Sequence, residues 1–571
     1  MKLLFALPVL CCVFCFKTFA STPPLEPIPD SLKKNAWSVI RYSNEKWNVV
    51  SLSKIELEIA YGLTVLCPKG EKDAPVYIPY DRNSKVKAIK VVILDKSGKL
   101  IRKIKSKDIG DYSYYDGYTL YSDNRYKYIK IQNITYPFTV LVSYKMVFNG
   151  TPSFGNFKPL NQYNQSVQQA KFSIALSDTN ILKHKEINFP QQGLKTFENG
   201  KFVLSWEVNN LKALEREPYS TYLDEKTPMV LTQCRRFIYD GVPGEVSDWA
   251  SVSSFVSGLE KGRDELPAET VETIKKLVSE TPDTLKKIEK IYQYMQNRTR
   301  YVSIQVGIGG WQTFPAATVD KLGYGDCKAL SNYTKALLNC AGIKAFNAIV
   351  EAGRNKSKHF DFAGFNQFNH QILMVPLAND TVWLECTSQT APFNYLGNFT
   401  SNRKALEIKP TNGKLIRTQY MDTLINRSRA SHLLIPGING NLQAVSRFVE
   451  SGWYFDDPSF VVNLSPKEQK DWFVDFMGLS IEKLNHLTIR RLAESKPPEI
   501  EITASYLVSG QASVSGSRMF IPLDFSRKAS PVKPDSSHVS PFKIDWSTVN
   551  SDTLNYRSEE HTSELQSPNT I

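Results

Sequence analysis

Three side chains in the middle of the chain have the types and the order of a nucleophile, its base and an acid: Cys327, His370 and Glu385. A cysteine thiolate attacks acyl carbons, a histidine takes up and returns the proton, and a carboxylate fixes the tautomer of that histidine. Such a set breaks or exchanges amide bonds through a thioester and needs no metal or cofactor. We therefore take these residues as the candidate catalytic set and expect no cofactor.

Cys327 stands at the predicted start of a helix, within "GYGDCKALSNYTKALL". Apolar positions recur there at helical spacing, and Gly342 ends the pattern; they are Leu330, Tyr333, Thr334, Leu337 and Leu338. In a first turn, the helix dipole and the free backbone N–H groups favour a thiolate and can face an oxyanion. Asp326 opposes this effect unless its carboxylate caps the helix. Cys340, near the other end of the helix, is expected to be structural.

His370 and Glu385 lie on the two strands of a predicted hairpin, "NHQILMVPLANDTVWLECTS". A two- or four-residue loop centred on Asn379–Asp380 would pair Val375 with Leu384 and place His370 and Glu385 on the same face. The two side chains would then be offset diagonally by several residues. A loop of odd length would separate them onto opposite faces.

The elements that must position these residues divide the 571-residue chain into several predicted domains. Short alternating runs over 35–220 predict an antiparallel, sandwich-like β domain. Helical periodicity appears within 245–410, clearest in a helix with Thr281 as its N-cap and Pro282 at its first position. Alternation returns over 420–556 and predicts a second β domain.

Both ends of the chain require separate treatment. Lys2, the apolar run 3–16 and a small residue at Ala20 have the three parts of a secretory signal, so residues 1–20 are predicted to be a cleaved signal peptide. No later run is long and apolar enough to span a bilayer. At the other end, "RSEEHTSELQS" matches the translation of a sequencing-library adapter. We therefore expect 557–571 to be an artefact and the last β domain to be truncated.

Charge and cysteine content narrow the function further. The net charge is +13, with its densest basic stretch at Lys85–Lys107, where the turn Lys96–Lys99 predicts a hairpin with solvated lysines. An anionic envelope surface or an acidic substrate fits this charge better than nucleic acid.

Five cysteines follow the signal, an odd number that leaves at least one thiol unpaired; they are Cys67, Cys234, Cys327, Cys340 and Cys386. No spacing indicates a zinc site.

These blocks resemble one known family. "YGDCKALSNYTKALLNCAGIKA", "FNHQILMVPL" and "DTVWLECTSQ" look like the cysteine, histidine and acid blocks of the transglutaminase-like superfamily, over about 265–410. The resemblance implies an α+β multidomain chain whose papain-like core is flanked by two β-rich domains. The first resembles a domain of unknown function often found ahead of such cores in exported bacterial proteins. Glu385 stands where the family usually has aspartate, and its extra methylene requires a shifted backbone or rotamer.

The resemblance also implies an oxyanion donor upstream of the cysteine, for which Gln305 and Trp311 are candidates. The function expected is a peptidase or amidase acting on a peptide, a protein or a cell-envelope polymer in the periplasm or outside the cell, with hydrolysis favoured over cross-linking. His359 and Asp361 remain an alternative base and acid. A buried Cys327 would instead favour an inactive binding or scaffold protein for polypeptide or glycan.

Overall fold

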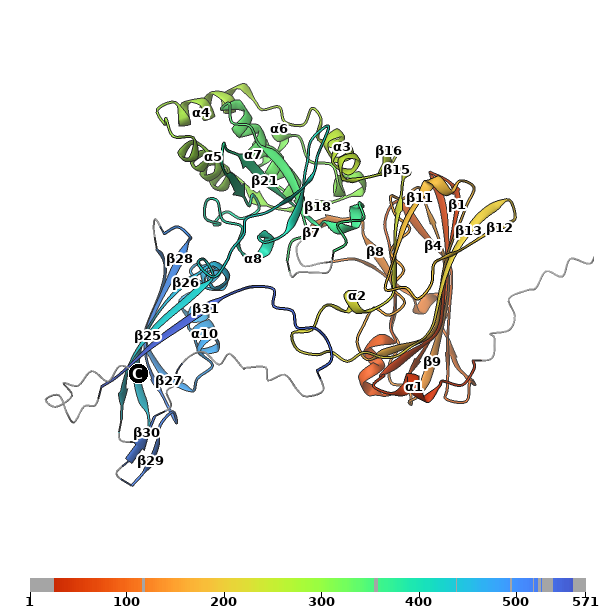
Figure 1. The fold of residues 1–571 in the computed structure, drawn as a ribbon, viewed down its shortest axis with the longest axis horizontal. Helices are drawn as coiled ribbons and strands as arrows, with labels where there is room; N and C mark the ends of the chain where they lie inside the picture. Colours follow the sequence, from red (N-terminus) through yellow and green to blue (C-terminus); the bar gives the residue numbers. More distant parts are fainter. Residues whose placement is uncertain are drawn as a thin grey trace, which may run out of the picture.

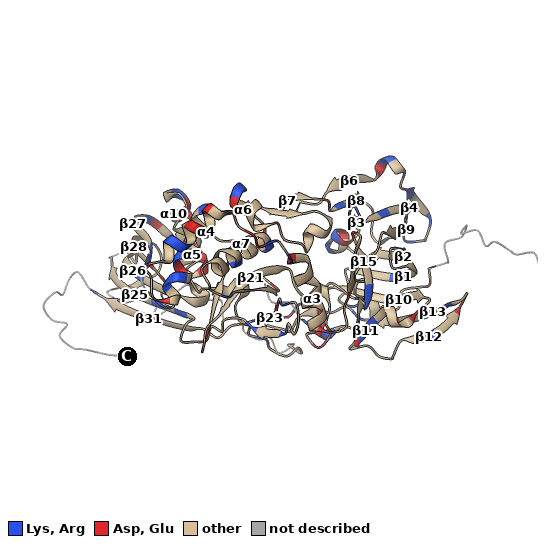
Figure 2. Ribbon diagram, turned by 90° about the horizontal axis from the view of Figure 1, so that it is seen from above, with Lys and Arg blue, Asp and Glu red and all other residues tan. Residues whose placement is uncertain are grey.

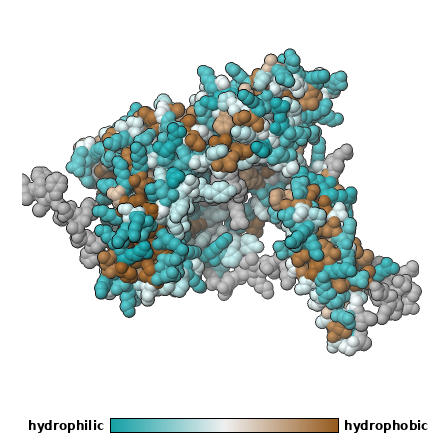
Figure 3. All heavy atoms as spheres, turned by 180° about the vertical axis from the view of Figure 1, so that it is seen from behind, coloured by the Kyte–Doolittle hydropathy of each residue, from teal (hydrophilic) through white to brown (hydrophobic). Residues whose placement is uncertain are grey.

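The computed structural model describes residues 25–115, 119–353, 358–437, 439–492, 495–516, 518–521, 525 and 538–557. The predicted signal peptide and residues 558–571 of the predicted artefact lie outside them. Within these residues the chain is a strand-rich, mixed α and β molecule with several sheets. Figure 1 shows a central region of helices and sheet between two β-rich regions, which stand apart below it. The same separation is visible from behind in Figure 3.

The N-terminal region is built on one eight-stranded sheet. Its strands lie in the order β12 (Leu194–Glu198), β13 (Lys201–Leu211), β10 (Gln165–Leu176), β1 (Ser38–Ser51), β2 (Lys54–Val65), β9 (Phe138–Phe148), β4 (Ser84–Leu94) and β5 (Leu100–Lys103). The sheet is not wholly antiparallel as expected, because β1 pairs in parallel with β10. The long connection between these two strands allows the chain to return in the same direction.

Smaller sheets cover the large sheet and share its hydrophobic core, which includes Val140 of β9, Ile78 of β3 and Val230 of β14. The elements of this second layer and its connections are α1 (Asp30–Lys33), β3 (Val76–Tyr80), β6 (Gly110–Ser113), β8 (Arg125–Ile129), β11 (Leu182–Ile187), α2 (Leu223–Lys226), β14 (Met229–Cys234), β15 (Arg236–Tyr239) and β16 (Val242–Glu245). The same core continues into the central region through Val252 and Val256. The two regions are therefore packed together rather than joined by a linker alone.

The basic stretch forms the expected hairpin. Strands β4 and β5 pair in antiparallel fashion, and Gly98 adopts a positive φ of 83° in the turn between them. Lys85, Lys87 and Lys90 are exposed along β4. Figure 2 shows that basic residues are spread over the molecule and interleaved with acidic ones, so no single element carries the net charge.

The central region packs helices against a five-stranded antiparallel sheet. The sheet order is β22 (Thr381–Leu384), β21 (His370–Pro376), β20 (Phe346–Val350), β23 (Lys404–Glu407) and β24 (Leu415–Arg417). The helices are α3 (Trp249–Glu260), α4 (Ala268–Val278), α5 (Thr284–Arg298), α6 (Ala316–Leu322), α7 (Cys327–Cys340) and the short α8 (Gly397–Thr400). Helix α7 lies between this sheet and helices α4, α5 and α6, and nearly all of its side chains are buried.

Helix α5 begins later than the sequence indicated. Its N-cap is Asp283, whose carboxylate accepts the Lys286 N–H at 2.8 Å, rather than Thr281. The carboxylate thus satisfies a free N–H of the first turn, and the proline precedes the cap instead of following it. Leu285 in the first turn is 44% exposed, whereas Tyr292 further along the helix is buried.

Two short parallel pairings hold the segment before α7. Strand β17 (Arg300–Tyr301) pairs with β19 (Tyr324–Gly325), directly before Cys327. Strand β18 (Ser303–Gln305) pairs with β7 (Thr119–Ser122), which belongs to the N-terminal region. A strand of the first region is therefore added to the central region, and Figure 1 shows β7 and β18 side by side.

The C-terminal region is a five-stranded sheet covered by two helices. Its strands lie in the order β27 (Ile481–Leu492), β28 (Glu499–Val508), β26 (Leu442–Ser451), β25 (Arg427–Pro436) and β31 (Val549–Tyr556), with helices α9 (Asp456–Val461) and α10 (Pro466–Met477) and a separate pair, β29 (Ser513–Ser515) and β30 (Arg518–Phe520). Phe473 and Met477 of α10 are fully buried against the sheet. In the part of the chain that the structure describes, no helix has the length and apolar character needed to cross a membrane.

Candidate active site

Cys327 is the first residue of α7 and is buried, with only 7% of the residue exposed, which is the setting expected for the inactive binding or scaffold alternative. The Asp326 carboxylate caps the helix by accepting the Ala329 N–H at 2.9 Å, so its charge is engaged with the helix. The adjacent Lys328 is also buried and forms an ion pair with Asp326. Burial alone would lower the pKa of Lys328, but the charges of Asp326 and Cys327 outweigh burial and raise it. Lys328 is thus a fixed cation beside the nucleophile, a setting that stabilises a thiolate.

The glycines before Cys327 permit the tight turn that places it. Gly323 ends α6 with a left-handed φ of 69°, a conformation that favours glycine. At Gly325 a Cβ atom would lie 2.6 Å from the Ala329 Cβ, too close for any side chain without movement of the helix. The close approach of this turn to the first turn of α7 therefore depends on glycine.

His370 and Glu385 meet at the end of the predicted hairpin, but in a different register from the one expected. The structure pairs Leu373 with Leu384, whereas the expected loop pairs Val375 with Leu384. A shift of two residues keeps every side chain on its face, so His370 and Glu385 still face the same side. It also brings them two residues closer, to neighbouring diagonal positions. The His370 Nε2 atom lies 3.0 Å from Glu385 Oε2 and 3.2 Å from Oε1.

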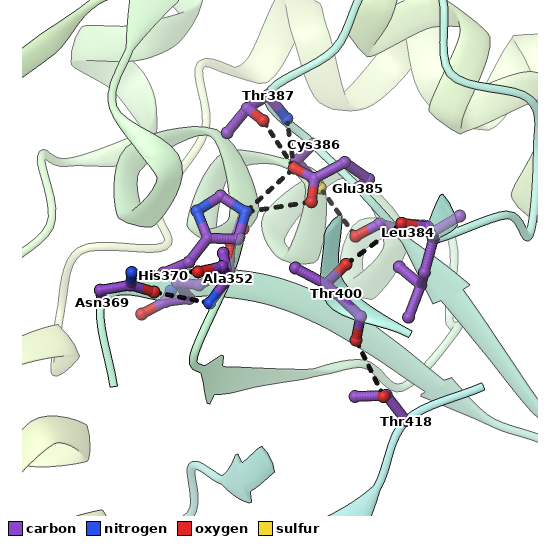
Figure 4. A network of polar contacts seen from close by, with 12 residues as sticks. Ala352, Asn369, His370, Leu384, Glu385, Cys386, Thr387, Thr400 and Thr418 are labelled. Carbon is purple, nitrogen blue, oxygen red and sulfur yellow. Dashed lines mark hydrogen bonds and ion pairs between the residues drawn. The ribbon is translucent and has the colours of Figure 1, made fainter. Parts of the chain in front are cut away.

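The Glu385 carboxylate is held from several directions, as Figure 4 shows for part of the network. Oε1 accepts the Thr387 hydroxyl at 2.6 Å and the Thr387 N–H at 3.1 Å. The Glu385 carbonyl accepts the Tyr292 hydroxyl of α5 at 2.7 Å. The longer acid is therefore accommodated by placing it just beyond β22 and tying it to the turn that follows. Neither Thr387 nor Lys328 was singled out from sequence, because no spacing signal marks them.

His370 lies between the acid and the cysteine. Its ring interacts with the Glu385 carboxylate through Nε2, and Cys327 is the other group that acts on it and raises its pKa. Phe399 of the segment around α8 packs edge-on against the ring, with centroids 5.3 Å apart. The side chains of His370 and Glu385 are each 8% exposed. The three candidate residues are thus brought together in a nearly dry setting.

Charges in this setting favour a protonated histidine. Burial opposes the imidazolium, but the Glu385 carboxylate and the hydrogen bonds with Cys327 and Glu385 outweigh it and raise the pKa of His370 to about 10. Burial likewise opposes the Glu385 carboxylate, yet the His370 charge and the hydrogen bonds from His370 and Thr387 lower the pKa of Glu385. The pair is therefore an imidazolium and a carboxylate near neutral pH, and can hold an anionic sulfur at Cys327.

The two oxyanion candidates lie in different surroundings. The Gln305 amide donates to the Asp326 carboxylate at 3.4 Å, so it is close to the first turn of α7. Trp311 packs edge-on against Phe365, with ring centroids 4.7 Å apart. This pair belongs to the aromatic contacts that join the N-terminal and central regions.

The alternative base and acid are occupied elsewhere. His359 lines a pocket between the N-terminal and central regions together with Asn156 and Gln233, and Asp361 forms an ion pair with Lys185. Neither is among the contacts of Cys327 or His370 that the structure records.

The other thiols differ from Cys327 in their surroundings. All five cysteines after the predicted signal are free. Burial raises the pKa of Cys386 to about 12 and also raises the pKa values of Cys234 and Cys340. Among the described residues, no group of His, Cys, Asp and Glu side chains could hold a metal ion.

Comparison with known proteins gives a family match for part of the chain and a structural likeness for its overall fold. A family described as a domain of unknown function with a solved structure, DUF3857, matches residues 55–215. No curated protein matches the chain. A "putative protease" from Parabacteroides distasonis covers 86% of this chain and 95% of its own at 13% identity, with a TM-score of 0.56. At this identity the likeness shows the fold alone, and it extends over all three regions.

Other solved structures align less well. A "putative cysteine protease" from Cytophaga hutchinsonii covers 64% of this chain and 86% of its own at 10% identity, with a TM-score of 0.20. An M1 zinc metallopeptidase from Deinococcus radiodurans covers 43% of this chain and 55% of its own at 8% identity, with a TM-score of 0.17. These two TM-scores are too low to carry an argument.

Proposed function

We propose that the protein is an exported, transglutaminase-like cysteine peptidase or amidase, in which Cys327 is the nucleophile, His370 the acid and base, and Glu385 the acid that orients the histidine. The observation that carries this proposal is the position of the buried His370 ring between Cys327 and the Glu385 carboxylate. The fold likeness to a structure described as a protease supports the same class. The core would then be papain-like, with the nucleophile on a helix and the other two residues on a sheet.

In the first half-reaction, the Cys327 sulfur would attack an amide carbonyl and form a carbon–sulfur bond. The negative charge on the carbonyl oxygen would face N–H groups at the start of α7, with Gln305 as a further donor. His370 would then give its proton to the nitrogen as the carbon–nitrogen bond breaks, releasing an amine and leaving a thioester.

In the second half-reaction, water would give a proton to His370 and attack the thioester, releasing a carboxylic acid and restoring the thiolate. An amine in place of water would make a new amide and cross-link two chains. Hydrolysis is the form that we propose. The substrate class is a peptide or protein in the periplasm or outside the cell.

The first test is the pH dependence of alkylation by iodoacetamide, followed cysteine by cysteine with peptide mass spectrometry on the full chain. Cys327 is expected to react fast at pH 6, because the raised pKa values of His370 and Lys328 keep two positive charges beside its sulfur. Cys340 and Cys386 are internal controls in the same digest, because their raised pKa values predict slow reaction at that pH. A Cys327 rate no faster than that of Cys340 at pH 6 contradicts the proposal.

Turnover is tested separately on a library of peptides, with products identified by mass. New carboxyl termini are expected with the unchanged protein and absent with Cys327→Ala. Adding a primary amine distinguishes the two outcomes of the thioester, because transfer gives an amide heavier than the acid product. Cleavage that survives in Cys327→Ala would exclude this residue as the nucleophile.

A further inference from the structure

One face of the small sheet in the N-terminal region is made of tyrosines. The sheet order is β3-β8-β6, and its register places Tyr77 opposite Tyr128 and Tyr112 opposite Tyr126. Because alternate residues of a strand point to opposite faces, these side chains share one face, and Tyr114 continues it beyond β6. We call Tyr77, Tyr112, Tyr114, Tyr126 and Tyr128 the tyrosine face.

The tyrosine face points away from the hydrophobic core. Val76 and Ile78, which alternate with Tyr77 along β3, are buried in that core. On the other side, Tyr77 is 60% exposed, Tyr112 50% and Tyr114 55%. An exposed group of contiguous aromatic side chains is uncommon on a soluble surface and marks an interaction site.

The rings are ordered by one another and by the sheet beneath. Tyr77 and Tyr128 have ring centroids 4.8 Å apart, and Tyr126 lies 5.8 Å from Tyr77 and 5.7 Å from Tyr112. On the opposite face, Asp111 accepts the Tyr80 hydroxyl at 2.7 Å and forms ion pairs with Arg125 and Lys127. A surface ordered in advance loses little conformational entropy when it binds a partner.

The tyrosine face and the candidate active site are linked through β7. The strand that follows β6 is β7, and its Ser122 pairs with Gln305 of β18. The Gln305 side chain donates to Asp326, the residue before the nucleophile. Leu120 and Tyr121 of β7 are also exposed, one on each face of this short strand.

We propose that the tyrosine face is a docking surface for an extended segment of a polypeptide substrate that carries apolar or aromatic side chains. The segment would lie across the face while another part of the same substrate reaches Cys327 along β7 and β18. This inference rests on the function proposed above, and it names the substrate as a polypeptide long enough to occupy both places.

The chemistry of the face favours polypeptide over two other partners. An anionic membrane would require basic side chains on this face, but Arg125 and Lys127 point to the opposite face and are paired with Asp111. A glycan stacks best on coplanar rings, whereas the contacts of Tyr126 with Tyr112, Tyr114 and Tyr128 are inclined by 34°, 82° and 73°. Tilted tyrosines instead suit side chains and peptide groups of another protein.

The test measures binding in the absence of turnover. The full chain with Cys327→Ala is titrated against fluorescently labelled β-casein, an unfolded protein rich in proline and apolar residues, and anisotropy gives the Kd. Adding Tyr77→Ser and Tyr112→Ser together is expected to raise the Kd about tenfold, since tyrosines that a bound partner buries are frequent binding hot spots. Tyr420→Ser is the matched control: Tyr420 is 58% exposed but lies outside the tyrosine face, so the Kd should not change.

Further arms make each outcome decisive. If the double variant lowers the thermal unfolding midpoint, Tyr114→Arg replaces it, because Tyr114 lies beyond the β6–β8 ladder; the same loss of binding is expected. An unchanged Kd in these variants overturns the inference. So does displacement of casein by cellohexaose, or vesicle binding to phosphatidylglycerol that the tyrosine variants abolish. Binding is measured without the nucleophile, so an unreactive Cys327 in the alkylation test would refute the proposed function alone.

Discussion

Two buried histidine side chains in different regions have similar aromatic neighbours, but their pKa values are shifted in opposite directions. His370 begins β21 in the central region, and His432 lies within β25 in the C-terminal region. Each packs edge-on against phenylalanine, His370 on Phe399 and His432 on Phe448, with centroids 5.3 Å apart in both cases. Burial lowers the pKa of His432, whereas the pKa of His370 is raised to about 10.

The difference lies in the polar partner of each ring. Nδ1 of His432 lies 2.7 Å from the Ser446 hydroxyl, which in turn lies 2.8 Å from the Tyr506 hydroxyl, and all three residues are buried. The partner of His370 Nε2 is a carboxylate at 3.0 Å. A neutral hydroxyl satisfies a ring nitrogen without stabilising a positive charge, whereas a carboxylate in a dry site stabilises it strongly.

Burial and hydrogen bonding therefore do not distinguish His370, the proposed acid and base, from His432 in this chain. The presence of a fixed acid, itself held by Thr387, makes the difference. His432, Ser446 and Tyr506 form a network suited to stability, because a buried proton acceptor without a charge partner remains neutral. The comparison can be tested by removing the acid from one histidine and by titrating the other.

The largest effect is expected from Glu385→Gln. The amide keeps the shape but removes the charge, so the pKa of His370 should fall from about 10 and its imidazolium should be less stable. We expect kcat of peptide cleavage to fall about 10²- to 10⁴-fold, the usual range for loss of a general acid or of its orienting group. The measurement is kcat over pH 5 to 10 in the peptide-cleavage assay proposed above.

Glu501→Gln is the matched control, because Glu501 is also a buried, paired carboxylate, bound to Arg447 and Arg490 in the C-terminal region. It should leave kcat unchanged. If the two variants had equal kcat, the Glu385 carboxylate would have no special role in activity. The carboxylate partner would then not explain a functional difference between His370 and His432.

The parts of this site that sequence could predict are those that depend on local periodicity. The helix from Cys327 follows from apolar spacing, and the Asp326 cap from residue type. His370 and Glu385 share a face because a two-residue error in register preserves parity. The loop Leu377–Asp380, closed by the Leu377 N–H donating to the Asp380 carbonyl, is what moved the register.

Contacts between distant segments could not be predicted in the same way. Strand β7 pairs with β18 across 184 residues, as the Thr119 and Ser303 hydroxyls 3.0 Å apart illustrate. Nothing in the alternation of either segment specifies its partner, because a short strand accepts many neighbours. The tyrosine face has the same origin: its tyrosines come from three strands that only the fold brings together.

The second prediction concerns His432 and has the opposite sign from an ion-paired histidine. Its pKa in the folded protein is lowered, so between that value and about 6.5 the unfolded chain binds more protons than the folded one. Stability is therefore fully present above about pH 6.5 and falls with decreasing pH by at most about 1.4 kcal/mol per unit from this group. The Asp552 charge on β31 opposes this effect only in part.

Guanidinium unfolding at pH 7.5 and 5.5 measures this effect. The loss of stability on acidification should be smaller in His432→Gln than in the unchanged protein by about 1 kcal/mol. His486→Gln, at an exposed histidine of β27, serves as the control and should retain the full loss. Equal losses in all three proteins would show that His432 does not remain neutral when buried.

The smallest effect is expected from Thr387→Val, which removes the 2.6 Å hydroxyl contact with Glu385 but keeps the backbone N–H. One such hydrogen bond contributes about 1 kcal/mol, so kcat should fall roughly fivefold. Because the threonine positions the acid, KM should stay the same, while the acidic limit of the pH profile moves up, since the hydroxyl helps to hold the pKa of Glu385 low. Thr390→Val, at an exposed position three residues along, should change neither quantity. If kcat fell equally in the two variants, Glu385 would keep its orientation without the Thr387 hydroxyl. The position of Glu385 on the hairpin would then be enough to give His370 and His432 different pKa values.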